Sequence, residues 1–124
     1  MSDRIRVLSV DDHPLVREGL ALAINSQPGL LMVAQASNGR EAIERFREHQ
    51  PDVTLMDLRL PDMSGIDAMI GIRTEFPDAR IIILTTYASD SESQRALAQG
   101  ARAYVLKTAS PKDLAETIRQ VHIS

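Results

Sequence analysis

The chain has 124 residues, of which 44% are hydrophobic and 25% are charged; these values are typical of one globular domain with a single core and argue against a disordered or fibrous chain. The formal net charge of −3 and the pI near 5.5 argue against a nucleic-acid-binding surface, because such a surface needs basic side chains that neutralise phosphates. The sequence contains no cysteine, no apolar run of membrane-spanning length and no signal-peptide pattern, so we expect a soluble, cytoplasmic protein without a membrane segment.

Strand patterns alternate with helix patterns along the first half of the chain. Residues 5–10 form an apolar, β-branched run, and after an Asp-Asp-His-Pro segment a helical pattern covers residues 15–24. We predict a second strand over residues 30–36 and a second helix over residues 40–49.

The same alternation continues through the second half. A third strand is predicted from Pro51 to Met56, and residues 65–76 show helical spacing. On this helix Ile66, Met69, Ile70 and Arg73 follow the 3.6-residue period. The remaining predicted elements are a strand over residues 80–84, a helix over 91–99, a strand over 103–106 and a helix over 110–122.

Five strands that alternate with five helices predict a parallel sheet covered by helices on both faces, because parallel strands need right-handed crossover connections. Five units without a sixth strand favour the strand order 2-1-3-4-5. In this order the first and third strands are neighbours, so the residues that follow them lie side by side at the carboxyl edge of the sheet.

Four of the predicted strands are followed by a polar residue. Asp11 and Asp12 follow the first strand, Asp57 the third, Thr85 the fourth and Lys107 the fifth. We expect these side chains to converge on one crevice, where three carboxylates, a hydroxyl and an ammonium group face each other. A single aspartate in such a place can equally cap a helix or start a turn, but the matched set indicates a site that handles phosphoryl groups.

Three adjacent carboxylates repel one another unless a cation or protons intervene. A divalent cation is the simpler solution, and oxygen ligands of this kind favour Mg²⁺. We therefore predict a Mg²⁺ site at Asp11, Asp12 and Asp57. His13 adjoins the acidic pair, but because Mg²⁺ prefers oxygen ligands we assign His13 a role in the loop or in packing.

Four motifs together resemble the receiver domain of bacterial response regulators. They are VDDHPLVREGL, MDLRLPDMSG, ILTTYA and GARAYVLKTAS. Asp57, Thr85 and Lys107 stand 28 and 22 positions apart, which fits the acceptor aspartate, hydroxyl and lysine of that family. The first motif resembles most the NarL/FixJ group, whose receivers usually precede a LuxR-type helix-turn-helix domain. The resemblance covers essentially the whole chain and implies the flavodoxin-like (βα)5 fold, a three-layer α/β sandwich.

The resemblance also implies roles for the residues of the predicted site. Asp57 is expected to accept a phosphoryl group from a sensor histidine kinase, and Lys107 to pair with a phosphoryl oxygen. Thr85 is expected to assist the transfer and, with Tyr104, to switch an output surface; the plain alternative is that both are ordinary strand residues. The expected Mg²⁺ ligands are Asp11, Asp12, Asp57 and the backbone carbonyl of Arg59.

Arg59 and Tyr87 are bulky, and each stands two positions beyond a key residue. We expect both side chains to overhang the site and to hinder attack by water. They would then slow the loss of the phosphoryl group from Asp57.

By this resemblance the chain is a receiver over residues 1–124, not an enzyme beyond its own phosphorylation and dephosphorylation. Any C-terminal effector domain is absent from this chain, and we expect contact with DNA and control of transcription only through such a domain. A homodimer is predicted through the first and last helices, with the face of the fourth helix, fifth strand and fifth helix as the alternative. The first option rests on more apolar residues than one core-facing stripe requires, and either helix could form the contact. These residues are Leu15, Gly19, Leu22 and Ala23 on the first helix and Leu114, Ile118 and Val121 on the last.

Two other classes of function stay open at this point. A receiver-like binding module that works without phosphorylation has the same fold, although the intact set of site residues argues against it. Haloacid-dehalogenase-type phosphatases also use an aspartate, a hydroxyl residue, a lysine and Mg²⁺. Their nucleophile follows the first strand in a DxDxT/V motif, whereas this chain has Asp-Asp-His-Pro there.

Overall fold

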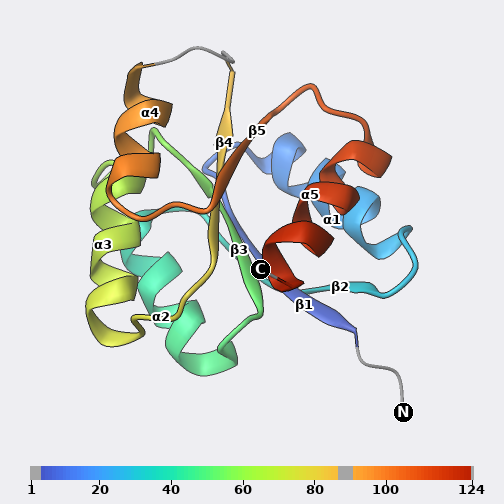
Figure 1. The fold of residues 1–124 in the computed structure, drawn as a ribbon, viewed down its shortest axis with the longest axis horizontal. Coiled ribbons are helices and arrows are strands. Elements are labelled where there is room, and N and C mark those ends of the chain that lie inside the picture. Colours follow the sequence, from blue (N-terminus) through green and yellow to red (C-terminus); the bar gives the residue numbers. More distant parts are fainter. Residues whose placement is uncertain (1–3, 87–90, 124) are drawn as a thin grey trace.

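Five parallel strands form one sheet in the order β2-β1-β3-β4-β5 (Figure 1). The computed structural model of the chain describes residues 4–86 and 91–123. The predicted parallel sheet and its strand order are confirmed. The strands are β1 (Ile5–Val10), β2 (Leu30–Ala36), β3 (Val53–Asp57), β4 (Ile81–Thr85) and β5 (Ala103–Leu106).

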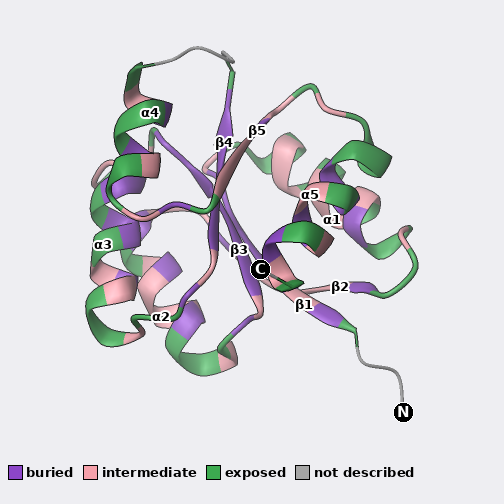
Figure 2. Cartoon of the chain, viewed as in Figure 1, coloured by how far each residue is buried: buried purple, intermediate pink, exposed green. Residues whose placement is uncertain are grey.

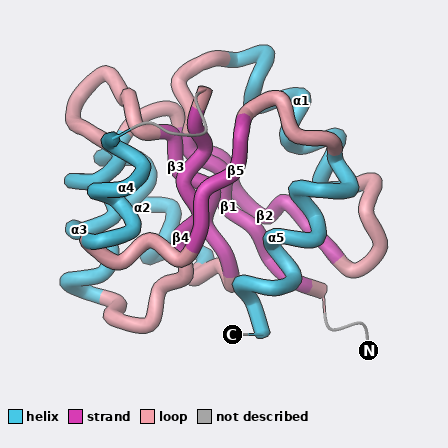
Figure 3. The backbone as a smooth tube through the Cα atoms, turned by 45° about the horizontal axis from the view of Figure 1, so that its top comes forward, coloured by secondary structure: helices cyan, strands magenta, loops and turns pink. Residues whose placement is uncertain are grey.

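Helices cover both faces of the sheet, so the predicted three-layer α/β architecture is also confirmed. One layer holds α1 and α5, and the other holds α2, α3 and α4 (Figure 3). The helices are α1 (Pro14–Asn25), α2 (Gly39–His49), α3 (Gly65–Glu75), α4 (Ser91–Ala98) and α5 (Pro111–Ile123).

Alternation along the buried strands fills one apolar core on each face of the sheet. On β4, Ile81 and Ile83 belong to the core beneath α2, α3 and α4, whereas Ile82 and Leu84 belong to the core beneath α1 and α5. Figure 2 shows the central strands buried along most of their length. Because these strands are apolar on both faces, the polar groups at their carboxyl ends are exceptions that need an explanation.

The expectation that the apolar residues of the last helix exceed one core-facing stripe is wrong for α5. Leu114, Ile118 and Val121 are buried in the core that α5 shares with the sheet. They are spaced four and three residues apart, as on the apolar face by which a helix packs against a sheet. These three residues therefore belong to the core and are not available for a dimer contact. On α1, by contrast, Leu15 is 82% exposed and Leu22 is 75% exposed, as predicted.

The periodic residues of α3 are not all buried. Ile70 is 41% exposed, whereas Ile66 and Met69 are buried together with Ile72. These residues recur every three positions along α3 and form its contact with the sheet, and Ile70 lies beyond the edge of that stripe.

Element boundaries differ from the predictions by a few residues. The third strand begins at Val53 and not at Pro51, because proline has no N–H to give to the sheet, while the Asp52 carboxylate accepts a 2.9 Å hydrogen bond from the backbone of Arg6. Thr85 is the last residue of β4 and not the first residue after it. Among the helices of residues 4–86 and 91–123, none is long and apolar enough to span a membrane.

Candidate functional site

The polar strand ends meet at one edge of the sheet, as predicted. In the strand register Val10, the last residue of β1, pairs with Met56 of β3. Asp11, directly after β1, therefore lies beside Asp57 at the end of β3. Asp11 is fully buried, and Asp57 and Thr85 are almost so. Lys107 follows β5, and its backbone N–H donates to the Thr85 carbonyl at 2.8 Å.

Lys107 joins the two most buried carboxylates. Its Nζ lies 2.9 Å from Asp11 Oδ2 and donates a 3.1 Å hydrogen bond to Asp57 Oδ2. The lysine side chain is only 21% exposed, so this contact is shielded from water and from salt much more than a surface ion pair. One ammonium group therefore lies between a carboxylate of β3 and a carboxylate that follows β1.

Burial and neighbouring charges set the ionisation of this triad. Burial, and then the charge of Asp11, raise the pKa of the Asp57 carboxyl, and the Lys107 ammonium only partly opposes them. Burial also acts to raise the pKa of Asp11. Hydrogen bonds from the His13 backbone and from Lys107 outweigh it, so the pKa of Asp11 falls below its ordinary value. For Lys107, the effect of burial is outweighed by its two carboxylate partners, which raise the pKa of the ammonium.

His13 contacts the acidic pair directly, a contact that the sequence reasoning did not foresee. Its Nδ1 lies 2.8 Å from Asp11 Oδ1 and 3.2 Å from Asp12 Oδ1, and its backbone N–H donates to Asp11 Oδ1 at 2.9 Å. The hydrogen bond to Asp11 and the charge of Asp12 raise the pKa of the imidazole. The position of His13 next to two aspartates was the signal available in the sequence.

The loop that carries Asp11 is fixed by residues that were not predicted as part of the site. The Arg17 guanidinium donates to the Asp11 carbonyl at 2.8 Å, and the Gln35 side chain donates to the Arg17 carbonyl at 2.7 Å. The Asp11 backbone N–H donates to Ala36 at 3.0 Å. Gln35 is the one side-chain amide in the otherwise apolar strand 30–36, and this was the only hint of its role.

The loop after Asp57 is fixed at both of its ends. The Gly65 N–H donates to the Leu58 carbonyl at 2.7 Å, and a Cβ at Gly65 would collide with the Asp57 carbonyl. Asp62 accepts hydrogen bonds from the first two backbone N–H groups of α2, at Gly39 (2.8 Å) and Arg40 (3.0 Å). These bonds lower the pKa of Asp62. The loop therefore holds the backbone around Asp57 in one conformation.

Four other residues were predicted to belong to the site: Arg59, Thr85, Tyr104 and Tyr87. Arg59 is largely exposed, and its guanidinium lies 3.5 Å from Glu92 on α4, while its backbone N–H donates to Asp57 Oδ1 at 3.3 Å. Thr85 is buried at the end of β4, and Tyr104 is half-buried on β5, where it packs against the core beneath α2, α3 and α4. Tyr87 lies outside the described residues.

The donor atoms at this edge suit a hard divalent cation. Asp11, Asp12, His13 and Asp57 each offer one ligand atom, and these atoms all lie within 4.8 Å of one another. Asp12 Oδ1 is buried, and it has no hydrogen-bond partner in the described part of the chain. This oxygen lies 3.2 Å from His13 Nδ1. Converging carboxylate oxygens, one of them without a hydrogen bond to any described residue, fit Mg²⁺.

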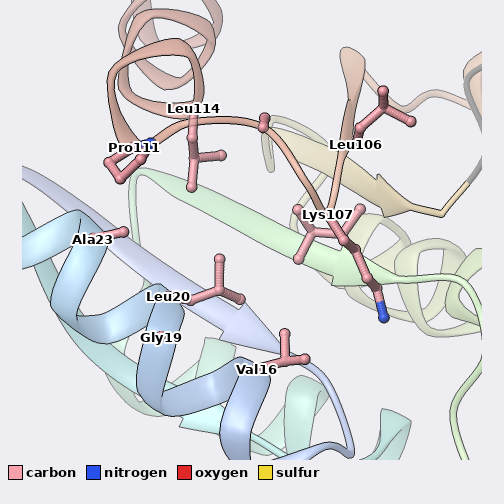
Figure 4. A pocket seen from close by; sticks show the side chains of 10 residues that line it. Val16, Gly19, Leu20, Ala23, Leu106, Lys107, Pro111 and Leu114 are labelled. Carbon is pink, nitrogen blue, oxygen red and sulfur yellow. The ribbon is translucent and has the colours of Figure 1, made fainter.

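An apolar pocket lies beside the site (Figure 4). It has a volume of about 270 Å³ and separates α1 from the connection between β5 and α5. Leu20, Leu106 and Leu114 line it together with Lys107. Figure 4 shows the Lys107 side chain at the edge of this pocket, with its nitrogen pointing away from Pro111 and Leu114. Lys107 thus borders an apolar pocket while its ammonium reaches the carboxylates.

Comparison with known proteins identifies the family. The family model for the response regulator receiver domain matches residues 7–119. Response regulator protein VraR of Staphylococcus saprophyticus is 40% identical over 118 residues, which are 95% of this chain and 56% of VraR. VraR of Staphylococcus aureus is also 40% identical, over 94% of this chain and 56% of VraR. The chain therefore spans little more than half the length of these curated relatives.

Solved structures give the same result. A LuxR-family two-component response regulator from Aurantimonas sp. SI85-9A1 superposes with a TM-score of 0.91 at 38% identity, covering 97% of this chain and 86% of that chain. The NarL signal receiver domain of Mycobacterium tuberculosis gives a TM-score of 0.92 at 29% identity, covering 98% of each chain. The chain thus belongs to the receiver domains of response regulators, the signalling proteins of two-component systems, and its relatives include those of the LuxR type.

Proposed function

We propose that Asp57 accepts a phosphoryl group from a sensor histidine kinase in the presence of Mg²⁺, and that this modification switches an output surface. The observation that carries the proposal is the position of Lys107, 3.1 Å from Asp57 and 2.9 Å from Asp11. An ammonium group beside the acceptor carboxylate supplies positive charge where an anionic phosphoryl group would arrive.

In the proposed transfer, a carboxylate oxygen of Asp57 attacks the phosphorus of a phosphohistidine. An O–P bond forms as the P–N bond breaks, and the electron pair of the broken bond stays on the imidazole nitrogen of the kinase, which takes up a proton. Lys107 then pairs with a phosphoryl oxygen in place of the Asp57 carboxylate.

The proposed Mg²⁺ ligands are Asp11, Asp12, Asp57 and the backbone carbonyl of Arg59. Asp12 is the more direct ligand of the first pair, because Asp11 already forms an ion pair with Lys107. A bound cation would offset the repulsion between the anionic acceptor and the anionic donor.

The switch is proposed to use Thr85 and Tyr104. If the Thr85 hydroxyl moves to donate to a phosphoryl oxygen, it leaves space into which the Tyr104 ring can turn. Register supports this pairing, because Tyr104 lies on β5 opposite Ile83, two residues before Thr85 on β4. Arg59 and Tyr87 are proposed to hinder attack by water on the phosphorylated aspartate.

The output is proposed to be control of transcription in the cytoplasm, through an attached helix-turn-helix domain that binds DNA. Its support is the likeness to VraR, of which this chain matches 56%, and to a LuxR-family regulator. A homodimer is part of the proposal. The exposed Leu15 and Leu22 favour α1 as its interface, and the face of α4, β5 and α5 remains the alternative.

The direct test is intact mass after incubation with acetyl phosphate and Mg²⁺. We expect the wild type to gain about 80 Da, one phosphoryl group, and the Asp57→Asn variant to gain nothing. Asp78→Asn, which changes an exposed aspartate before β4, is the matched control and should label like the wild type. Reactions without Mg²⁺ and with EDTA should show little label.

Two results would contradict the proposal. If the wild type gains no mass from acetyl phosphate or from a kinase extract while Mg²⁺ still binds, the chain is a binding module that works without phosphorylation. Steady release of phosphate from small phosphate esters, abolished by Asp11→Asn, would instead favour a phosphatase whose nucleophile follows β1.

A further inference from the structure

An ion pair joins the loop after the acceptor aspartate to α4. Arg59 stands two residues beyond Asp57, and its guanidinium lies 3.5 Å from the Glu92 carboxylate in the first turn of α4. The backbone of the same arginine donates to Asp57 Oδ1 at 3.3 Å. Arg59 therefore contacts the acceptor through its main chain and α4 through its side chain.

Few side chains anchor α4 to the sheet. Of its eight residues only Ser93 and Ala96 are buried, and one large apolar side chain, the partly buried Leu97, packs against the core. The Ser93 hydroxyl is buried, and it has no hydrogen-bond partner among the residues that the structure describes. Since one large apolar side chain and two small buried residues hold this helix, an ion pair at its first turn adds measurably to its attachment.

A phosphoryl group on Asp57 would compete for Arg59. The arginine side chain is 78% exposed, so it can turn without disturbing the core, and its backbone is already next to the acceptor carboxylate. A phosphoryl group carries up to two negative charges and three acceptor oxygens, and a guanidinium binds it more strongly than it binds one exposed carboxylate.

We propose that the Arg59–Glu92 pair is a latch that holds α4 in its unphosphorylated position and that opens when the phosphoryl group takes Arg59 as its partner. The inference rests on the proposed function, since it needs Asp57 to be the acceptor. It adds a second route from the site to the surface, separate from Thr85 and Tyr104. It also gives Arg59 a signalling role in addition to the shielding role expected from the sequence.

Hydrogen exchange in α4, measured by mass spectrometry, tests the latch. Without phosphoryl donors, we expect Glu92→Gln and Arg59→Gln each to raise the exchange of peptides covering α4 by about two- to five-fold, the range of an exposed ion pair. In wild-type protein, Mg²⁺ with beryllofluoride, a phosphoryl analogue, should raise the same exchange. Glu75→Gln breaks a similar exposed pair, with Arg47 at 2.9 Å, and should leave α4 unchanged.

The double variant gives the decisive comparison. Glu92→Gln also removes a favourable negative charge from the first turn of a helix, so part of its effect does not depend on Arg59. If the latch exists, Glu92→Gln has a clearly smaller effect in the Arg59→Gln background than in the wild type. Equal effects in the two backgrounds would overturn the latch.

The latch and the proposed function fail in different ways. If Asp57 takes up label from acetyl phosphate but the two variants act independently on α4, the latch alone is wrong. If Asp57 takes up no phosphoryl group, the proposed function is wrong, and the proposal that a phosphoryl group opens the latch is wrong as well. Label is read from the mass of the intact protein and helix opening from exchange, so the two results are independent.

Discussion

Helices α5 and α4 cover opposite faces of the sheet near β4 and β5, and they are attached by different means. Helix α5 places Leu114, Ile118 and Val121 in the core, whereas α4 buries only Ser93 and Ala96. The acceptor edge beside α4 also buries polar groups, with two carboxylates and an ammonium shielded from water. Helix α5 is thus held by three buried apolar side chains, whereas α4 is held by two small buried residues and the partly buried Leu97. Helix α4 also lies beside an edge of buried polar groups that can respond to a ligand.

The largest expected effect is on the α5 side. Ile118→Ala removes a fully buried side chain and should lower the free energy of unfolding by about 3 kcal/mol, measured by urea denaturation. Ile123→Ala on the same helix is the control: that side chain is 83% exposed, and its loss should cost less than about 0.5 kcal/mol. Similar losses for the two variants would show that α5 is not anchored as described.

A gain of stability is expected on replacing the acceptor. The pKa of Asp57 is raised in the folded protein, so folding takes up protons and the wild type becomes more stable as the pH falls from neutral towards its ordinary range near 4. The Asp57→Asn variant should lack this rise and be more stable at pH 7 by on the order of 1 kcal/mol.

Urea midpoints at pH 7, 6 and 5 compare the two proteins. Asp11 acts with the opposite sign and in another range, because its lowered pKa gives stability that is lost only as the pH falls below about 4. If the difference in urea midpoint between the wild type and Asp57→Asn stays constant from pH 5 to pH 7, burial of the charged carboxylate has no net cost in stability.

A smaller gain is expected on α4 itself. Ser93→Ala removes a buried hydroxyl that lacks a partner within the described ranges, and should stabilise the protein by about 0.5–1 kcal/mol while slowing exchange in α4. In Ser26→Ala the lost hydroxyl does have a partner, the Ala23 carbonyl at 2.8 Å, so no gain is expected. Loss of stability in Ser93→Ala would mean that this hydroxyl is satisfied in solution.

The smallest effect on stability is expected on the outer surface of α1. Leu15→Ser and Leu22→Ser change side chains that are already exposed, so the urea midpoint should hardly move. If α1 forms the proposed homodimer, both variants should weaken self-association in sedimentation equilibrium of the phosphorylated protein. Ile70→Ser, which changes an exposed apolar residue on α3, should leave association unchanged.

The sequence predicted the sheet and its acidic edge well because both depend on local patterns. The limits of β1, β2 and β5 follow directly from runs of apolar and β-branched residues, and parallel pairing brings the residues after those runs together. No knowledge of side-chain packing is needed for Asp11, Asp57 and Lys107 to meet.

What the sequence could not predict depends on contacts between distant segments. The burial of Leu114, Ile118 and Val121 is set by where α5 lies on the sheet. The helical period alone does not distinguish a buried apolar face from an exposed one. The roles of Arg17 and Asp62 arise from hydrogen bonds to the backbone of other segments, for which side-chain identity gives no signal. The pair of Arg59 with Glu92 spans 33 positions and has no motif.

The approach of Gly65 to the Asp57 carbonyl has a consequence for how this protein can vary. In a library of all single substitutions, scored for phosphorylation, we expect only glycine to be active at position 65. Every other residue has a Cβ, and this atom would collide with the main chain of Asp57 and Leu58 and not with a movable side chain. The neighbouring Asp67, exposed on the first turn of α3, should accept most replacements. A position that has no reactive group and still accepts no substitution would then show how closely the backbone packs around the acceptor aspartate.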